Sequence, residues 1–117
     1  MRADKREKIL KAMDLSHEDL EVPEWGVTIR VVSPSGRERT RIVTSFMNDD
    51  GTPDLEKMYP ALIIATASDP ETGERLFTAD DAEALLDKNG RVLERIARAA
   101  MRVAGMNDDT IDVGKDG

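Results

Sequence analysis

The longest apolar run of the chain, residues 59–68, lies in a sequence in which 35% of the residues are charged. The run reads YPALIIATAS, with the adjacent Ile63 and Ile64 at its centre. A run of this kind is expected to be buried on most sides, because removing apolar surface from water is the main favourable contribution to folding. The other elements are therefore expected to pack around it.

The conformation of this run is a choice between strand and helix. Pro60 makes a continuous helix costly, because proline lacks a backbone N–H and clashes with the preceding turn. The β-branched residues favour a strand over residues 61–67, and a turn at 69–73 would fold it back onto a short strand at 74–77. A helix over 61–67 is the alternative, since alanine and leucine also favour helices.

A second pair of strands is predicted nearer the N-terminus. Residues 20–22 and 27–32 alternate between apolar and polar side chains, and Pro-Glu-Trp-Gly at 23–26 interrupts the pattern as a hairpin turn does. Trp25, the only tryptophan, is expected beside this turn. There it either caps the core or anchors a partner.

Two shorter helices are predicted on either side of the apolar run. Ser33 is expected to cap the first, with Pro34 at its first helical position and Phe46 near its end. Thr78 is expected to cap the second, whose first turn is acidic as the helix dipole favours. Both helices carry apolar side chains that can face the run.

The strongest helical pattern covers residues 91–104. Its apolar side chains recur at the helical period and form a broad stripe. Arginines line the opposite side, and Glu94 is placed to pair with Arg98 one turn away. The row that includes Arg95, Arg98 and Arg102 either faces solvent or grips an acidic partner.

These elements predict a small single α+β domain, with an N-terminal β-hairpin and a second short hairpin packed with three to four helices. A length of 117 residues suits one domain. Residues 1–13 are predicted to be a basic helix or arm, either a frayed terminus or an interaction handle. Residues 14–106 are expected to form the domain, and 107–117 a disordered acidic tail.

Composition and charge disfavour several classes of function. A net charge of −7 and an aromatic content of 3% argue against nucleic acid as a partner, because phosphate binding relies on Lys and Arg and base stacking on aromatic rings. The single histidine, His17, has no cysteine or second histidine to complete a zinc site, so no metal, cofactor or enzymatic activity is predicted. No segment approaches the roughly 20 apolar residues of a membrane span, so an intracellular protein without membrane contact is expected.

Two stretches carry a family resemblance when they are taken together. The first is Leu-Glu-Val-Pro-Glu-Trp-Gly at 20–26, which is followed by a strand and a Ser-Pro helix start. The second is Ala-Leu-Ile-Ile-Ala at 61–65, followed by Asp69, Gly73 and Leu-Phe-Thr at 76–78. In this order they resemble the tail assembly chaperones of long-tailed bacteriophages, over roughly residues 9–106.

The resemblance implies a non-catalytic scaffold that binds and solubilises the tape measure protein and assists assembly of the tail tube. Such chaperones act in the cytoplasm of the host bacterium and are typically absent from the finished virion. They are often made in two lengths by ribosomal frameshifting, and the short acidic tail of this chain would correspond to the shorter form. The resemblance also makes the tail tube protein a second candidate partner. Whether the chain forms a homo-oligomer is left open. The alternative is a structural head–tail completion or connector protein that stays in the particle.

The residues expected to contact such a partner combine aromatic side chains with the face of the C-terminal helix. Aromatic side chains and arginine are enriched where protein partners bind most tightly. Methionines such as Met47 and Met106 offer further adaptable apolar contacts. The candidate set is Trp25, Phe46, Tyr59, Phe77, Arg95, Arg98 and Arg102.

Overall fold

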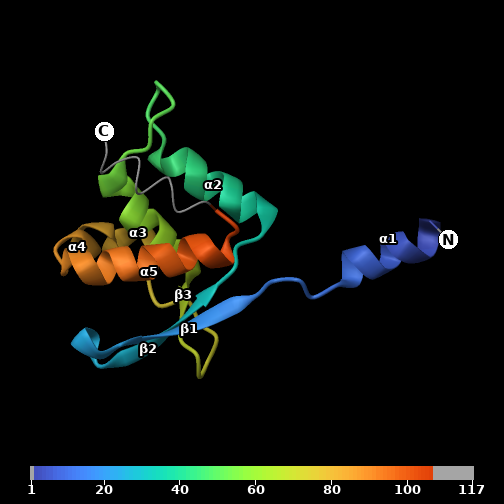
Figure 1. Cartoon of the computed structure of the whole chain (residues 1–117), viewed down its shortest axis with the longest axis horizontal. Coiled ribbons are helices and arrows are strands. Elements are labelled where there is room, and N and C mark those ends of the chain that lie inside the picture. Colours follow the sequence, from blue (N-terminus) through green and yellow to red (C-terminus); the bar gives the residue numbers. More distant parts are fainter. Residues whose placement is uncertain (1, 107–117) are drawn as a thin grey trace.

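The structure is a computed structural model that describes residues 2–106. Within these residues, five α-helices accompany a three-stranded antiparallel sheet (Figure 1), which confirms the predicted α+β class. The chain extends over 52 × 39 × 24 Å, with an N-terminal helix projecting from the body along the longest axis. The predicted acidic tail at 107–117 lies outside the described residues.

The predicted N-terminal hairpin is confirmed. It consists of β1 (His17–Val22), a 3-10 turn η1 (Pro23–Trp25) and β2 (Val27–Val32). The register pairs Val22 with Val27 at the turn. Gly26 completes the turn at φ 68°, a left-handed conformation that glycine adopts without a Cβ clash.

The apolar run is a helix, and the prediction of a strand over residues 61–67 is wrong. α3 (Leu55–Thr66) contains nearly all of the run, and only the two-residue β3 (Ala67–Ser68) pairs with β2. Pro60 is accommodated in the second turn, where it removes one intrahelical hydrogen bond. A helix buries this run between α2 (Gly36–Phe46) and α5 (Gly90–Val103), and tertiary packing of that kind outweighs β-branched propensity.

The second hairpin is shorter than predicted. The turn at 69–73 forms, with the Asp69 N–H donating to the Glu74 carbonyl at 2.8 Å, but the pairing beyond it is a single bridge between Ser68 and Arg75. The Arg75 guanidinium then donates to the carbonyls of Ile64 and Ala65 at the end of α3. This segment therefore satisfies carbonyl groups that the helix end leaves without an intrahelical partner.

The start of α2 differs from the prediction by two residues. Ser35 is its N-cap, and its hydroxyl accepts the Glu38 N–H at 3.2 Å. Ser33, the predicted cap, instead donates its N–H to the Ser16 carbonyl at 2.8 Å. Because this bond extends the pairing of β1 with β2, Ser33 is held in the extended conformation of the sheet.

The predicted acidic helix start is confirmed. Asp81 accepts the Thr78 N–H at 2.8 Å, at the beginning of a 3-10 turn that leads into a short helix. These two elements are η2 (Ala79–Asp81) and α4 (Ala82–Leu86). They lie against α3 at the end of the body opposite the projecting helix (Figure 1).

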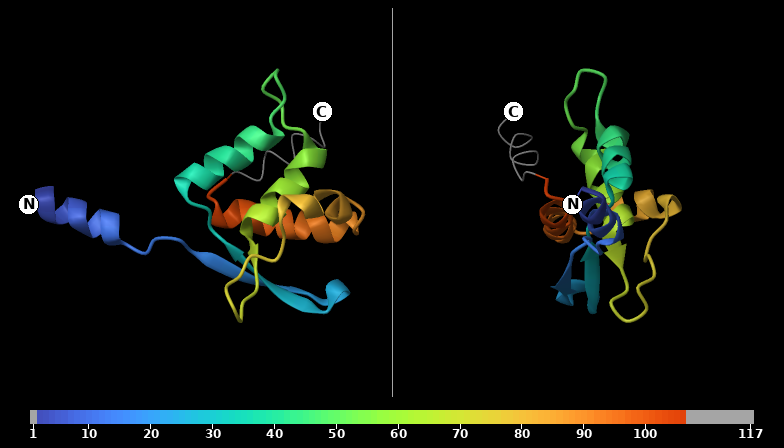
Figure 2. Two further views of the ribbon diagram at one scale, coloured as in Figure 1. Left: turned by 180° about the vertical axis from the view of Figure 1, so that it is seen from behind. Right: turned by 90° about the vertical axis from the view of Figure 1, so that its right-hand side faces the viewer.

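The core lies between the inner face of the sheet and the helices. In β2, Ile29 and Val31 are buried while their neighbours are more exposed, as the alternation predicts. α5 contacts both strands of the hairpin, and α3 lies between α2 and α5 (Figure 2). Among the helices of residues 2–106, none combines the length and apolar composition needed to cross a membrane.

Candidate partner-binding surface

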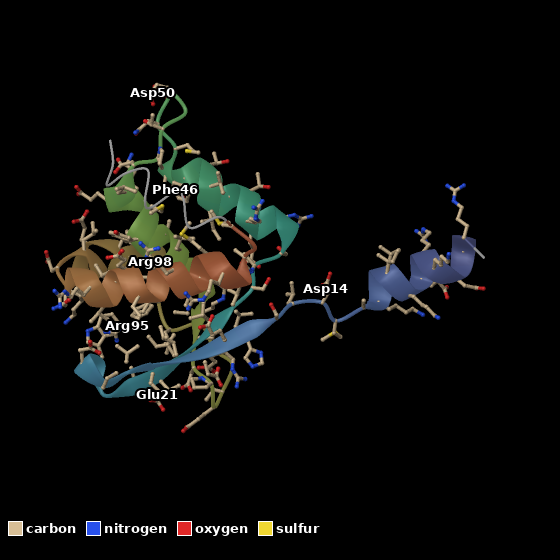
Figure 3. The ribbon with its side chains drawn as sticks, in the orientation of Figure 1. Asp14, Glu21, Phe46, Asp50, Arg95 and Arg98 are labelled. Carbon is tan, nitrogen blue, oxygen red and sulfur yellow. The ribbon has the colours of Figure 1, made fainter. Side chains whose placement is uncertain are left out.

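Ion pairs join α5 to the hairpin beneath it. Arg95 meets the Glu24 carboxylate with both terminal nitrogens, at 2.9 and 2.6 Å, beside the turn of the hairpin (Figure 3). Arg102 meets Glu18 of β1 at 2.8 and 3.3 Å. Two positions of the predicted arginine row therefore fix the helix on the sheet.

The same contacts lower the pKa of the acidic partners. The Arg95 guanidinium, by hydrogen bonding, lowers the pKa of Glu24 from 4.5 to about 2. On the outer face of the hairpin, a hydrogen bond from Arg30 likewise lowers the pKa of Asp19. These carboxylates stay charged at neutral pH, which suits a structural ion pair and gives them no capacity for proton transfer there.

The remaining arginine of the predicted set also has a partner in its own chain. Arg98 pairs with Glu94 at 2.9 Å, one helical turn away, as the spacing predicts. Arg95, Arg98 and Arg102 therefore each form an ion pair with a glutamate of their own chain. These side chains still keep about a quarter to a half of their surface exposed, so they can contact a partner at the rim.

The predicted aromatic residues do not form one surface. Trp25 is half-buried at the hairpin turn, directly after Glu24 and therefore next to the Arg95 pair. Tyr59 in α3 and Phe77 before η2 are half-buried against the core. Phe46, the last residue of α2, is only 1% exposed and belongs to the core, so it is a packing residue in this fold (Figure 3).

A groove at the hairpin end supplies apolar surface that the sequence pattern did not reveal. It measures about 410 Å³ and runs between the hairpin turn and the loop that follows β3. Val27 and Leu76 line it and are 49% and 42% exposed. The signal for Val27 was present in the alternating pattern, but only the tertiary structure shows that its end of the inner face is uncovered. We call this the hairpin-end groove.

The projecting N-terminal helix exposes a second apolar set. α1 (Arg2–Lys11) buries none of its residues, and the segment after it is also exposed. The helix and this segment expose four large apolar side chains, which are Ile9, Leu10, Met13 and Leu15. The sequence leaves two interpretations of this arm open, a frayed terminus and an interaction handle, and the exposure of its side chains fits both.

The described residues offer surfaces for binding. Within residues 2–106, no group of three or more histidine, aspartate or glutamate side chains is arranged to hold a metal ion. The lowered pKa values of Asp19 and Glu24 come from hydrogen-bonded arginines on the surface, whereas acid–base catalysis needs a pKa close to the working pH. The exposed apolar sites, with the charges around them, are the candidate partner-binding surface.

The sequence and the fold of this chain both resemble those of known proteins. The family model described as phage tail assembly chaperone matches residues 5–115. A search of solved structures finds the tail assembly chaperone of bacteriophage HK97, with a TM-score of 0.56 and 20% sequence identity over 86% of this chain and 97% of that one. At this identity the match supports the fold. No curated protein matches the chain.

Proposed function

The chain belongs to the phage tail assembly chaperone family, and from that premise we propose that it binds and solubilises the tape measure protein of its phage. The observation that carries the proposal is the family match, which spans almost the whole chain. An acidic protein with a net charge of −7 also suits this work, since charge far from zero keeps a complex with an apolar client in solution. We propose that it acts without catalysis and assists assembly of the tail tube.

We place the first client contact at the hairpin-end groove. An amphipathic helix binds by setting its apolar face into such a groove, and Val27 and Leu76 supply exposed apolar walls. Trp25 directly precedes Gly26, which lines this groove, and its exposed part is the aromatic anchor of the proposed contact. Arg95 holds the turn in place through Glu24 and so acts on the client contact indirectly.

The other predicted contacts take different roles in this proposal. Tyr59 and Phe77 keep part of their surface exposed and extend the contact beyond the groove. Arg98 and Arg102 lie at the rim, where charge sets the rate and specificity of association more than its strength. Phe46 is left out because the core covers it.

Co-expression with the tape measure protein tests the proposal. The client is expected to precipitate alone and to stay soluble in complex with this chain. Leu76→Asp should lower the yield of soluble client at least severalfold, because a charge would then face the client's apolar side chains. Met47→Asp is the matched control for the groove, since Met47, which the sequence suggested only as a further apolar contact, is also 42% exposed but does not line the groove.

The outcomes separate the function from the site. A client that stays soluble equally with both variants removes the hairpin-end groove from the proposal. A client whose solubility does not depend on the wild-type chain overturns the chaperone role toward the tape measure protein. Normal circular dichroism spectra of both variants establish that each has folded.

We further propose that the protein works in the cytoplasm of the host bacterium and leaves the tail before the virion is complete. Mass spectrometry of purified particles tests this, with the chain expected in lysates and absent from particles. Stoichiometric amounts in the particle would instead support a head–tail completion or connector subunit. Pull-down of the tail tube protein tests the second partner.

A further inference from the structure

The two walls of the hairpin-end groove are held in different ways. One wall is the end of the hairpin, where Val27 is paired with Val22 in the sheet, and the other is the loop of residues 69–76. No residue of this loop is buried, so apolar packing does not fix it on the body. Figure 2 shows the loop, in yellow, projecting from the body in both views. The position of the second wall therefore depends on the polar contacts that the loop makes.

Hydrogen bonds inside the loop set its shape. The Asp69 N–H donates to the Glu74 carbonyl at 2.8 Å, and the Gly73 N–H donates to the Asp69 carbonyl at 2.7 Å. These bonds close the loop on itself, so they do not determine where it lies relative to the helices. At the end of the loop, the Leu76 N–H donates to the Ala67 carbonyl of β3 at 3.1 Å.

Arg75 reaches from the loop to two helices. Its guanidinium donates to the carbonyls of Ile64 and Ala65 at the end of α3. It also donates to the Glu38 carboxylate of α2 at 2.8 Å, and this hydrogen bond lowers the pKa of Glu38. A planar guanidinium with several donors can make these contacts at the same time, whereas the ammonium of a lysine is a single point of charge. One side chain thus ties the loop to both helices.

Leu76 follows Arg75 directly and forms part of the groove wall. Arg75 is bridged to Ser68 in an antiparallel pair, and successive side chains of an extended segment point to opposite sides. Turning Arg75 toward the helices therefore directs Leu76 away from them. Leu76 is 42% exposed and lines the groove together with Val27.

From these contacts we propose that Arg75 is a positioning residue for the client contact. Held by α3 and by Glu38, it fixes the loop so that Leu76 stands as the second wall of the groove. Arg75 does not itself line the groove, so it acts through Leu76. The inference rests on the proposed function, because it gives Arg75 a role in the groove where the client is proposed to bind.

Spin-label distances test the positioning without any client. The sequence contains no cysteine, so Thr28→Cys with Glu74→Cys introduces one label on the hairpin and one on the loop. Electron paramagnetic resonance should give a narrow distance distribution with native Arg75, and one at least about twofold broader with Arg75→Gln, because the loop then lacks its tie to the helices. Arg41→Gln is the matched control, since Arg41 is an exposed arginine of α2 that does not line the groove, and it should leave the distribution unchanged.

Co-expression with the tape measure protein tests the consequence for binding. Arg75→Gln should lower the yield of soluble client about three- to tenfold, since a surface ion pair and hydrogen bonds from a charged group each contribute modestly. Arg75→Lys should lose less, because lysine keeps the charge and can still pair with Glu38. Glu38→Gln should add little to the loss caused by Arg75→Gln, because both changes remove the same contact. Urea unfolding of each variant establishes that the protein has folded.

A distance distribution that stays narrow in Arg75→Gln overturns the positioning role. So does a wild-type yield of soluble client when the distribution has broadened, because the position of the loop would then not matter to the client. A wild-type chain that fails to solubilise the client overturns the proposed function instead. The spin-label distances still decide in that case whether Arg75 holds the loop.

Discussion

The first and last helices of the described chain carry the same net charge of +3, yet one projects into solvent and the other lies at the centre of the fold. α1 has five basic and two acidic residues, and α5 has four arginines and one glutamate. α5 buries seven residues, whereas α1 buries none. A broad apolar stripe gains enough from burial to offset the entropy of ordering a helix, whereas α1 buries no residue that could offset it. Charge is therefore not what decides where a helix lies in this protein.

Hydrogen exchange should show the largest difference between the two helices. Amides of α5 are expected to exchange on the order of a thousandfold or more slower than in an unfolded chain, because they open only with the core. Amides of α1 should exchange almost as fast as in a free peptide when the protein is dilute. Mass spectrometry of peptic fragments measures both in one experiment. Equal protection in dilute solution would mean that α1 is already covered, contrary to the comparison.

Equivalent isoleucines should differ strongly in their effect on stability. Ile96→Ala in α5 leaves a cavity at a fully buried position and should lower the free energy of unfolding by about 2–5 kcal/mol. Ile9→Ala in α1 should change it by less than about 0.5 kcal/mol. Urea unfolding followed by the fluorescence of Trp25 measures both. A large effect at Ile9 would show that the arm contributes to the stability of the monomer.

The N-cap of α5 offers a smaller change. The Asn89 side chain accepts the N–H groups of Arg91 and Val92, at 2.9 and 3.4 Å. Asn89→Ala should cost about 1 kcal/mol by leaving these donors without that acceptor. Asn89→Asp is the control and should preserve stability, because a carboxylate accepts the same bonds. If alanine and aspartate behave alike, the cap does not stabilise α5.

The smallest effect is expected from the ion pair that attaches α5 to the hairpin turn. The pKa of Glu24 is lowered to about 2, so its contribution to stability is present above pH 4.5 and disappears as the pH falls toward 2. Glu24→Gln should remove that part of the acid dependence, with only a slight fall in the melting temperature at pH 7, since surface ion pairs contribute little. Thermal unfolding between pH 7 and pH 2 measures it. Parallel pH profiles for variant and wild type would contradict the assignment of the pair.

Patterns that act over a few residues were enough to predict much of this fold. The hairpin, the acidic start at Thr78, the Glu94–Arg98 pair and the long helix at 91–104 follow from alternation, capping and helical spacing. These signals are local, and the structure confirms each of them. The family resemblance also arose from sequence motifs, and the family match confirms it.

The tertiary structure decided what local patterns left open. Residues 61–67 read as either strand or helix, and burial between α2 and α5 selected the helix in spite of Pro60 and the β-branched side chains. It also showed that Arg75 joins the end of α3 to Glu38 of α2, at 2.8 Å from that carboxylate and across 37 positions of sequence.

The candidate sites divide in the same way. The sequence by itself determined the composition of each helix face, including the basic arm with its isoleucine and leucine. Only the tertiary structure decided that Phe46 is covered, that Arg95 and Arg102 contact the hairpin, and that Val27 and Leu76 share a groove. The physical reason is that exposure depends on contacts between segments far apart in the chain, which periodicity and propensity do not encode.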